Sequence, residues 1–138
     1  MRPTRCERVA APGFTLVELM IVVVIVAILA LAAVPLYMAN IKTSRMSEGM
    51  TGVGMIRMSL RIYASGNGGR YPVIAGERGD NLGVLNIVPA DLSGKYFSPT
   101  DYVVTSAASH YAVRATLPED PNFWYEVDEA GNETKSYF

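Results

Sequence analysis

Residues 14–37 read FTLVELMIVVVIVAILALAAVPLY, and this stretch decides the fold of the chain. Its side chains are apolar except for those of Thr15 and Glu18. As an α-helix the stretch would be about 36 Å long, which exceeds the ~30 Å hydrocarbon core of a membrane. The β-branched run at residues 22–26 disfavours a helix in water, but in lipid the backbone has to satisfy its own hydrogen bonds. The stretch therefore predicts a membrane-spanning helix.

Basic residues lie immediately before this apolar stretch. Residues 1–13 carry a net charge of +2, because three arginines stand against one glutamate: Arg2, Arg5, Arg8 and Glu7. The whole chain has a net charge of −1. A basic segment before an apolar one predicts that this end stays in the cytoplasm. Since no basic field extends over the rest of the chain, no specific nucleic-acid binding is predicted.

The single cysteine, Cys6, lies within the basic segment. If that segment is removed, the product has no thiol and cannot form a disulfide. The globular part outside the cytoplasm would then have to be stabilised by packing alone. A lipid anchor on Cys6 is not expected, because no apolar region precedes it.

Three interpretations compete for the apolar stretch: a secretory signal peptide, a plain membrane anchor, and a processed leader. A secretory signal has a short apolar core followed by a small-residue cleavage site, whereas here Gly13 precedes a long core. A plain anchor has no use for Glu18, since a charged side chain at mid-bilayer costs roughly 2.5–3.5 kcal/mol. Cleavage after Gly13 would create an amine on Phe14. Glu18 of one chain could then neutralise the Phe14 amine of the next in a low dielectric.

The sequence GFTLVE, after a short basic leader and before an unbroken apolar run, resembles the prepilin peptidase site of type IV pilins and type II secretion pseudopilins. The resemblance extends over about residues 8–40. It implies cleavage between Gly13 and Phe14 on the cytoplasmic face, and N-methylation of the new Phe14 amine by the same peptidase. It also places Glu18 at the position of the family's assembly glutamate.

Other positions both agree with that family and depart from it. Pro35 and Tyr37 fall where pilins commonly carry proline and tyrosine. The family often has a glycine midway along the apolar stretch, where this chain has Ala27. Many pilins close a C-terminal disulfide loop, which this chain cannot form. Because Pro35 lacks an N–H group, it is expected to kink the helix over residues 31–35.

A helical pattern continues beyond the apolar stretch, over residues 38–66. Apolar side chains recur every three or four residues, as on one face of an amphipathic helix, at Met46, Met50, Val53, Ile56, Leu60 and Tyr63. Gly49, Gly52 and Gly54 each lower helix propensity by up to about 1 kcal/mol. Close packing against a neighbouring element and local flexibility are equally good explanations for them. The glycine-rich cluster at residues 65–69 predicts the end of the helix.

Residues 67–138 are expected to form the globular part. Residues 70–100 contain scattered glycine and proline and suggest a connecting loop region, which in pilins lies at subunit contacts. Three or four strands are predicted after it, at residues 101–106, 110–117, 122–128 and 133–138, with a hairpin turn at 128–132. Within the second of these, Tyr111, Val113 and Ala115 alternate with their neighbours, which places them on one face of the strand. The predicted fold class is α+β, with a long N-terminal α-helix packed against a small antiparallel sheet of three or four strands.

No enzymatic activity, metal or cofactor is predicted. His110 is expected to be structural or merely exposed. Four residues near the last turn could bind calcium through oxygen ligands, but a solvated turn is the preferred interpretation: Asp128, Glu129, Asn132 and Glu133. The sequence has no phosphate-binding loop, no nucleophile–base pair and no zinc-ligand spacing.

The favoured hypothesis is a structural subunit of a type IV pilus-like filament, with a leader at residues 1–13, a filament-core helix at 14–37, its continuation at 38–66 and a globular head at 67–138. The precursor would cross the inner membrane once, with the head outside the cytoplasm. It would be processed by a prepilin peptidase and polymerise with copies of itself through an inner-membrane assembly machinery. Two alternatives stay open: a pseudopilin in a periplasmic filament, and a monomeric membrane-anchored binding domain that keeps its leader.

Overall fold

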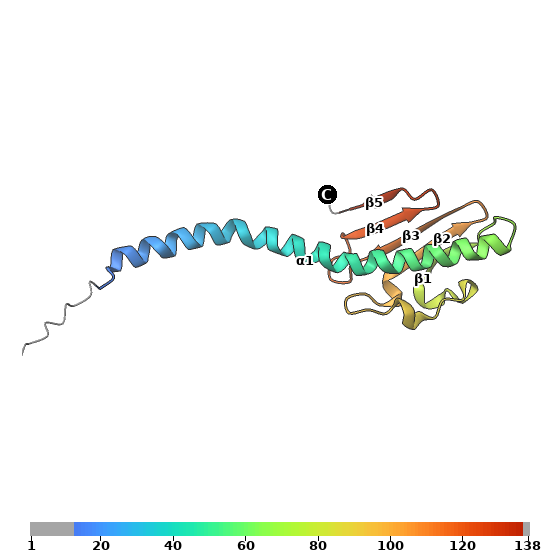
Figure 1. Ribbon diagram of the computed structural model, residues 1–138, viewed down its shortest axis with the longest axis horizontal. Coiled ribbons are helices and arrows are strands. Elements are labelled where there is room, and N and C mark those ends of the chain that lie inside the picture. Colours follow the sequence, from blue (N-terminus) through green and yellow to red (C-terminus); the bar gives the residue numbers. More distant parts are fainter. Residues whose placement is uncertain (1–12, 137–138) are drawn as a thin grey trace, which may run out of the picture. The chain divides into compact units, whose positions relative to one another are not determined.

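A computed structural model describes residues 13–136 of the chain (Figure 1). It divides into two compact units, residues 1–38 and residues 39–138, of which the first is described from Gly13 onward. Helix α1 (Leu16–Gly66) belongs to both units, with its first part in one and its second part in the other. The predicted leader residues Arg2, Arg5, Cys6, Glu7 and Arg8 lie outside the described residues.

The first unit consists of the apolar part of α1. Every residue from Gly13 to Asn40 is exposed to solvent in the isolated chain. By length and composition α1 is able to cross a membrane, which agrees with the prediction for residues 14–37. Pro35 lies inside the helix, and the residues on both sides of it are helical. The kink expected at Pro35 stays a prediction.

The second part of α1 is amphipathic, as predicted. Its buried residues follow the helical spacing: Met46, Gly49, Gly52, Val53, Ile56, Leu60 and Ala64. Met50 and Tyr63, also predicted on this face, are partly buried against the same core. The helix ends at Gly66 with Gly68 in the left-handed region at φ +64°, while the Gly69 N–H donates to the Ala64 carbonyl over 2.8 Å. This is the bonding pattern of a glycine-terminated helix, and it confirms the predicted stop.

Two of the three helix glycines allow the second part of α1 to approach aromatic rings closely. A Cβ at Gly49 would come within 2.6 Å of the Phe97 ring, and a Cβ at Gly52 would overlap the Tyr102 ring. A Cβ at Gly54 would meet nothing within 4 Å. The close-packing explanation is therefore correct for Gly49 and Gly52, whereas Gly54 has no packing role within the described part of the chain.

The sheet confirms the α+β class and has five antiparallel strands in sequence order, one more than the largest number predicted. The strands are β1 (Ile74–Arg78), β2 (Tyr102–Ala107), β3 (His110–Thr116), β4 (Trp124–Asp128) and β5 (Glu133–Lys135). Figure 1 shows the second part of α1 lying across one face of this sheet. The last four strands lie within or close to the predicted ranges, and residues 137 and 138 of the predicted last strand are outside the described residues.

The prediction of a loop region over residues 70–100 was wrong at β1. This strand pairs with β2, with Ile74 opposite Ser106 and a bulge between Ala75 and Glu77. Its sequence, IAGER, shows no alternation, and Gly76 takes φ +75°. Because the strand is formed by pairing with β2, which lies far away in the sequence, it has little local signal. Four short 3-10 helices occupy the rest: η1 (Gly79–Asn81), η2 (Gly83–Leu85), η3 (Pro89–Leu92) and η4 (Pro99–Asp101).

Alternate strand residues form the core with α1. The predicted inward-facing residues Tyr111, Val113 and Ala115 of β3 are buried, as are Tyr125 and Val127 of β4. Burying such a side chain contributes roughly 1.5–3 kcal/mol, so packing alone can stabilise a head that has no described disulfide.

Polar contacts fix the connections to α1. Lys42 and Asp120 form an ion pair of 2.7 Å, and Arg45 pairs with Glu119 in the same β3–β4 connection. Glu48 Oε1 accepts the backbone N–H groups of Tyr96 and Phe97, each at 2.9 Å. These contacts hold the connecting segments against one flank of the helix.

Candidate functional site at the start of helix α1

A reciprocal hydrogen-bonded cap opens helix α1. The Thr15 N–H donates to Glu18 Oε2 over 2.9 Å, and the Thr15 hydroxyl donates to the same oxygen over 2.8 Å. In return the Glu18 N–H donates to Thr15 Oγ1 over 3.2 Å. This is a capping box, in which a threonine and a glutamate three residues later satisfy backbone N–H groups that the helix leaves unpaired. The carboxylate also lies at the positive end of the helix dipole.

The role of Thr15 was missed in the sequence analysis, although the sequence carries the signal. The spacing T-L-V-E at residues 15–18 is the capping-box pattern. Glu18 was interpreted only as a partner for an amine in another chain. Both bonds that it accepts use Oε2, and a carboxylate can accept about four hydrogen bonds, so the cap leaves acceptor capacity for a second partner.

The proposed cleavage site lies just before the capped helix. Gly13 and Phe14 precede the first helical residue, and the side chain of Phe14 is 80% exposed. A Cβ at Gly13 would meet nothing within 4 Å. Exposed non-helical backbone is where proteases act most readily. Because this chain tolerates a side chain at position 13, any requirement for a small residue there has to come from the peptidase.

The surface that follows is apolar on every side. From Leu16 to Met38 the exposed large side chains are almost all aliphatic, and Glu18 is the one charged residue of this part of the helix. A helix that is hydrophobic all round is normally buried in a membrane or among other helices. This part of the helix can therefore pack in lipid, against other helices, or first in lipid and then against other helices.

The other candidate residues do not form a site. His110 is exposed, with Nδ1 3.3 Å from the Ser109 hydroxyl. The four calcium candidates form hydrogen bonds and an ion pair with other residues of the chain or with one another. Asp128 accepts two hydrogen bonds from Asn132, Glu129 accepts the Tyr111 N–H, and Glu133 pairs with Lys135. Across residues 13–136 no group of three or more potential metal-binding side chains is found.

Comparisons with known proteins gave a match at this end of the chain and a match over most of its length. The family model described as the prokaryotic N-terminal methylation motif matches residues 10–34. The fimbrial protein EcpC of Eikenella corrodens is 34% identical over 105 residues, which are 76% of this chain. The aligned region spans 61% of the length of that relative. No solved structure gives a significant match.

Proposed function

We propose that this chain, a pilin-like structural subunit of the type IV pilin family, is processed after Gly13 and polymerises through α1 into an extracellular filament. The precursor waits in the inner membrane with its head outside the cytoplasm. A prepilin peptidase removes the leader and methylates Phe14. An inner-membrane assembly machinery then transfers the helix from lipid into the filament.

The observation that carries this proposal is the single acid at the start of an otherwise apolar helix surface. An apolar helix can exchange lipid for neighbouring helices at little cost, because both environments are equally apolar. Glu18 is the exception, since a charge in such surroundings needs a partner. A processed Phe14 amine on a second copy supplies the opposite charge, and their pairing fixes the axial register of the two helices.

The capping box supports this role because it orients Glu18. The two Thr15 donors hold the carboxylate at the N-terminal end of the helix, where an incoming amine from a second copy approaches. Glu18 therefore has two functions in the proposal, a cap within its own chain and an ion-pair partner between chains.

Matched variants separate these two functions. If Glu18 acts only as a cap, Thr15→Ala and Glu18→Ala reduce filament yield equally. If Glu18 also pairs with the amine of a second copy, Thr15→Ala has a small effect, whereas Glu18→Ala gives processed protein that stays in the membrane. The yield is measured by quantifying this chain in sheared surface material. Equal yields from the two variants would contradict pairing between chains.

Processing is tested at the N-terminus itself. Mass spectrometry of the membrane-free product should find methylated Phe14 as the first residue. Gly13→Ala should slow trimming much less than Gly13→Leu, because the peptidase requires a small side chain there. A chain that still begins at Met1 would instead support a membrane-anchored domain that does not polymerise.

A pseudopilin of a type II secretion system is the second candidate within the family. The match to a fimbrial protein favours a surface pilus over a periplasmic filament. Electron microscopy of sheared cells, with this chain identified in the fibres by a labelled antibody, decides between the two locations.

A further inference from the structure

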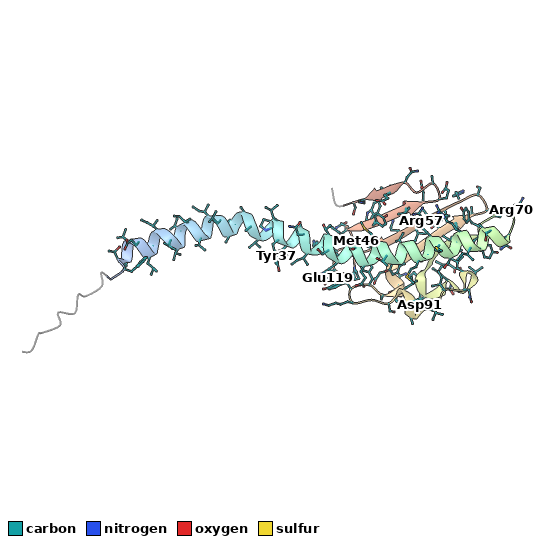
Figure 2. The ribbon with its side chains drawn as sticks, in the orientation of Figure 1. Tyr37, Met46, Arg57, Arg70, Asp91 and Glu119 are labelled. Carbon is teal, nitrogen blue, oxygen red and sulfur yellow. The ribbon has the colours of Figure 1, made fainter. Side chains whose placement is uncertain are left out.

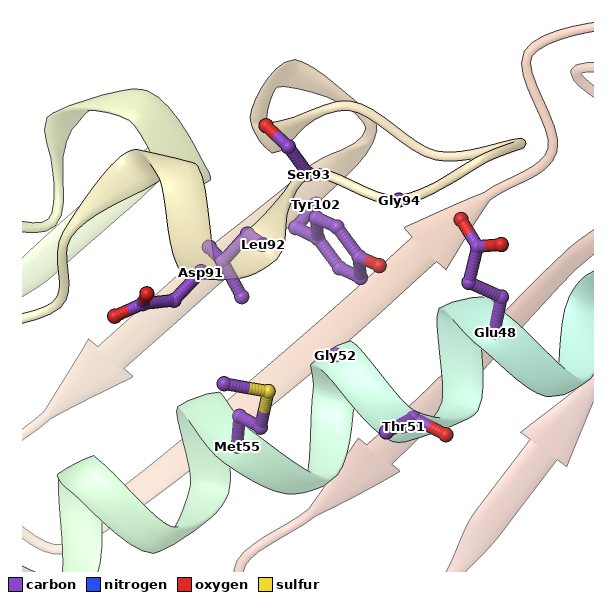
Figure 3. A pocket seen from close by; sticks show the side chains of 9 residues that line it. All are labelled: Glu48, Thr51, Gly52, Met55, Asp91, Leu92, Ser93, Gly94 and Tyr102. Atoms are coloured by element: carbon purple, nitrogen blue, oxygen red, sulfur yellow. The ribbon is translucent and has the colours of Figure 1, made fainter.

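A pocket of about 160 Å³ opens between the second part of α1 and the residues around η3 (Figure 3). Gly52, Met55 and Leu92 supply apolar lining, and three polar residues also line the pocket: Glu48, Asp91 and Tyr102. Figure 3 shows the Glu48 carboxylate and the Tyr102 hydroxyl at one end of the pocket and Asp91 at the other end, with its carboxylate directed outward. All of these residues belong to the unit formed by residues 39–138. The pocket thus combines an apolar lining with two carboxylates and a hydroxyl.

The Tyr102 hydroxyl is a buried polar group directed into this pocket. Tyr102 is 1% exposed, and its hydroxyl lies over Gly52, where an added Cβ would overlap it. Within residues 13–136 this hydroxyl has no hydrogen-bond partner. Burial, together with the charges of Glu48 and Asp101, raises the pKa of Tyr102 to about 12, so the side chain stays neutral. Because the hydroxyl lies at the pocket and no hydrogen bond with the described residues occupies it, it can bind a ligand group.

The two carboxylates make the pocket suitable for a cation. Partial burial by itself would raise the pKa of Glu48, but the N–H groups of Tyr96 and Phe97 lower it below its usual value, so Glu48 is ionised at neutral pH. These two bonds also hold the carboxylate in place, with acceptor capacity to spare. Asp91 is exposed, and its side chain has no partner among the residues that the structure describes.

A matching cation lies on the opposite flank of α1. Arg57 is directed toward β3, with Nε 3.3 Å from the Tyr111 hydroxyl, and Figure 2 shows Arg57 and Asp91 on opposite sides of the helix. Arg61 follows four residues later and so lies on the flank of Arg57. It is exposed and has no ion-pair partner within the described ranges. Arg61 therefore faces away from the pocket of its own chain.

We propose that the pocket binds the Arg61 guanidinium of a second copy of this chain against the Glu48 carboxylate and the Tyr102 hydroxyl, with Asp91 adding negative charge at the rim of the pocket. A guanidinium has five N–H donors and no acceptor, which suits three acceptor side chains. Because pocket and arginine lie on opposite flanks of one helix, the contact is head-to-tail, and such contacts propagate into rings or filaments. The inference rests on the proposed function and names a lateral contact between heads.

Exposed apolar residues between the two flanks add to the contact surface. Met58 is 66% exposed and Ile62 is 61% exposed, and both lie on the outer face of α1 between the pocket flank and the arginine flank. Aliphatic area around a charge pair excludes water from it and strengthens the pairing.

Cross-linking of filaments tests the contact directly. In the full chain carrying Cys6→Ser, we combine Arg61→Cys with Ser93→Cys, which lines the pocket. A short bis-maleimide should link chains of assembled filaments into ladders. The control pair, Arg61→Cys with Thr134→Cys, places the second thiol at an exposed position on β5 and should give no ladder.

Charge exchange tests the same contact without cysteines. Asp91→Arg and Arg61→Asp should each lower filament yield about tenfold, because each places like charges together, and the double exchange should restore most of it. Asp80→Arg, at an exposed acid outside the pocket, should leave the yield unchanged. Single variants at wild-type yield, or a folded double variant no better than the singles, would overturn the inference. If the chain with Arg61→Cys and Ser93→Cys forms filaments that give no ladder, this contact is wrong but the proposed function stands, whereas absence of the wild-type chain from all filaments contradicts both.

Discussion

The two parts of helix α1 differ in what covers their apolar side chains. In residues 39–66 one face carries apolar side chains and is covered by the sheet of the same chain. In residues 16–38 apolar side chains surround the helix, and nothing in the described chain covers them. The first arrangement is complete within one chain, whereas the second requires a partner outside it.

The difference shows what packing requires of the residues in each part. In residues 39–66 the identity of each residue matters. At positions 49 and 52 any side chain would clash with the aromatic ring that packs there, so both positions require glycine. In residues 16–38 the aliphatic character matters more than the individual residue, because lipid and neighbouring helices accept many shapes. Four variants test this contrast.

The largest effect is expected from a charge in the apolar part. Val24→Asp should reduce membrane insertion about a hundredfold, since an aspartate near mid-bilayer costs roughly 2.5–3.5 kcal/mol. The insertion ratio is measured by membrane fractionation with a glycosylation or protease-accessibility reporter on the head. The unfolding temperature of the head should not change, because residues 39–138 form a compact unit with a core of their own. A destabilised head would show that the two parts are not independent.

The next largest effect is expected at the close contact between α1 and β2. Gly52→Ala should lower the free energy of unfolding by about 1–3 kcal/mol, since its Cβ overlaps the Tyr102 ring. Gly54→Ala is the matched control and should raise stability by up to about 1 kcal/mol, because it gains helix propensity without a clash. Both are measured by denaturant unfolding of the full chain in detergent. Equal effects at the two positions would contradict the packing assigned to Gly52.

A smaller effect is expected at the cap of α1. Thr15→Ala should cost about 1 kcal/mol of local helix stability, because it removes the side-chain oxygen that accepts the Glu18 N–H. Hydrogen exchange should accelerate at the amides of the first helical turn. Thr51→Ala, whose hydroxyl bonds a carbonyl inside the helix, is the control and should leave those amides unchanged.

The smallest effect is expected on the stability of the head at low pH. Hydrogen bonds from Tyr96 and Phe97 outweigh partial burial and hold the pKa of Glu48 below the ordinary value of 4.5. Its stabilising contribution is therefore complete above pH 4.5 and is lost as the pH falls through the lower pKa of the folded state. The unfolding temperature of the head should fall as the pH is lowered below 4.5. It should fall less steeply in Glu48→Gln than in the wild-type chain. Asp80→Asn, at an exposed acid without a described side-chain partner, should keep the wild-type slope.

Local patterns predicted much of the fold. The apolar stretch, the amphipathic continuation and the glycine-rich end of α1 each follow from residues within a few positions of one another. The alternation of Tyr111, Val113 and Ala115 likewise predicted β3. At the candidate site the roles predicted from the sequence for Gly13, Phe14 and Glu18 stay predictions. The capping partner Thr15 could have been predicted from the spacing T-L-V-E at residues 15–18.

Only the tertiary structure decided the rest, because the forces involved act between distant residues. Strand β1 exists through pairing with β2, which follows more than twenty residues later, and its own sequence carries a bulge and a glycine. The packing role of Gly49 and Gly52 follows from the aromatic rings of Phe97 and Tyr102, which lie against them in the tertiary structure. The sequence determined which parts of the chain are apolar and at what period, since hydrophobic burial depends on side-chain type. Which surfaces meet depends on shape and on long-range pairing, and neither is encoded in any short window.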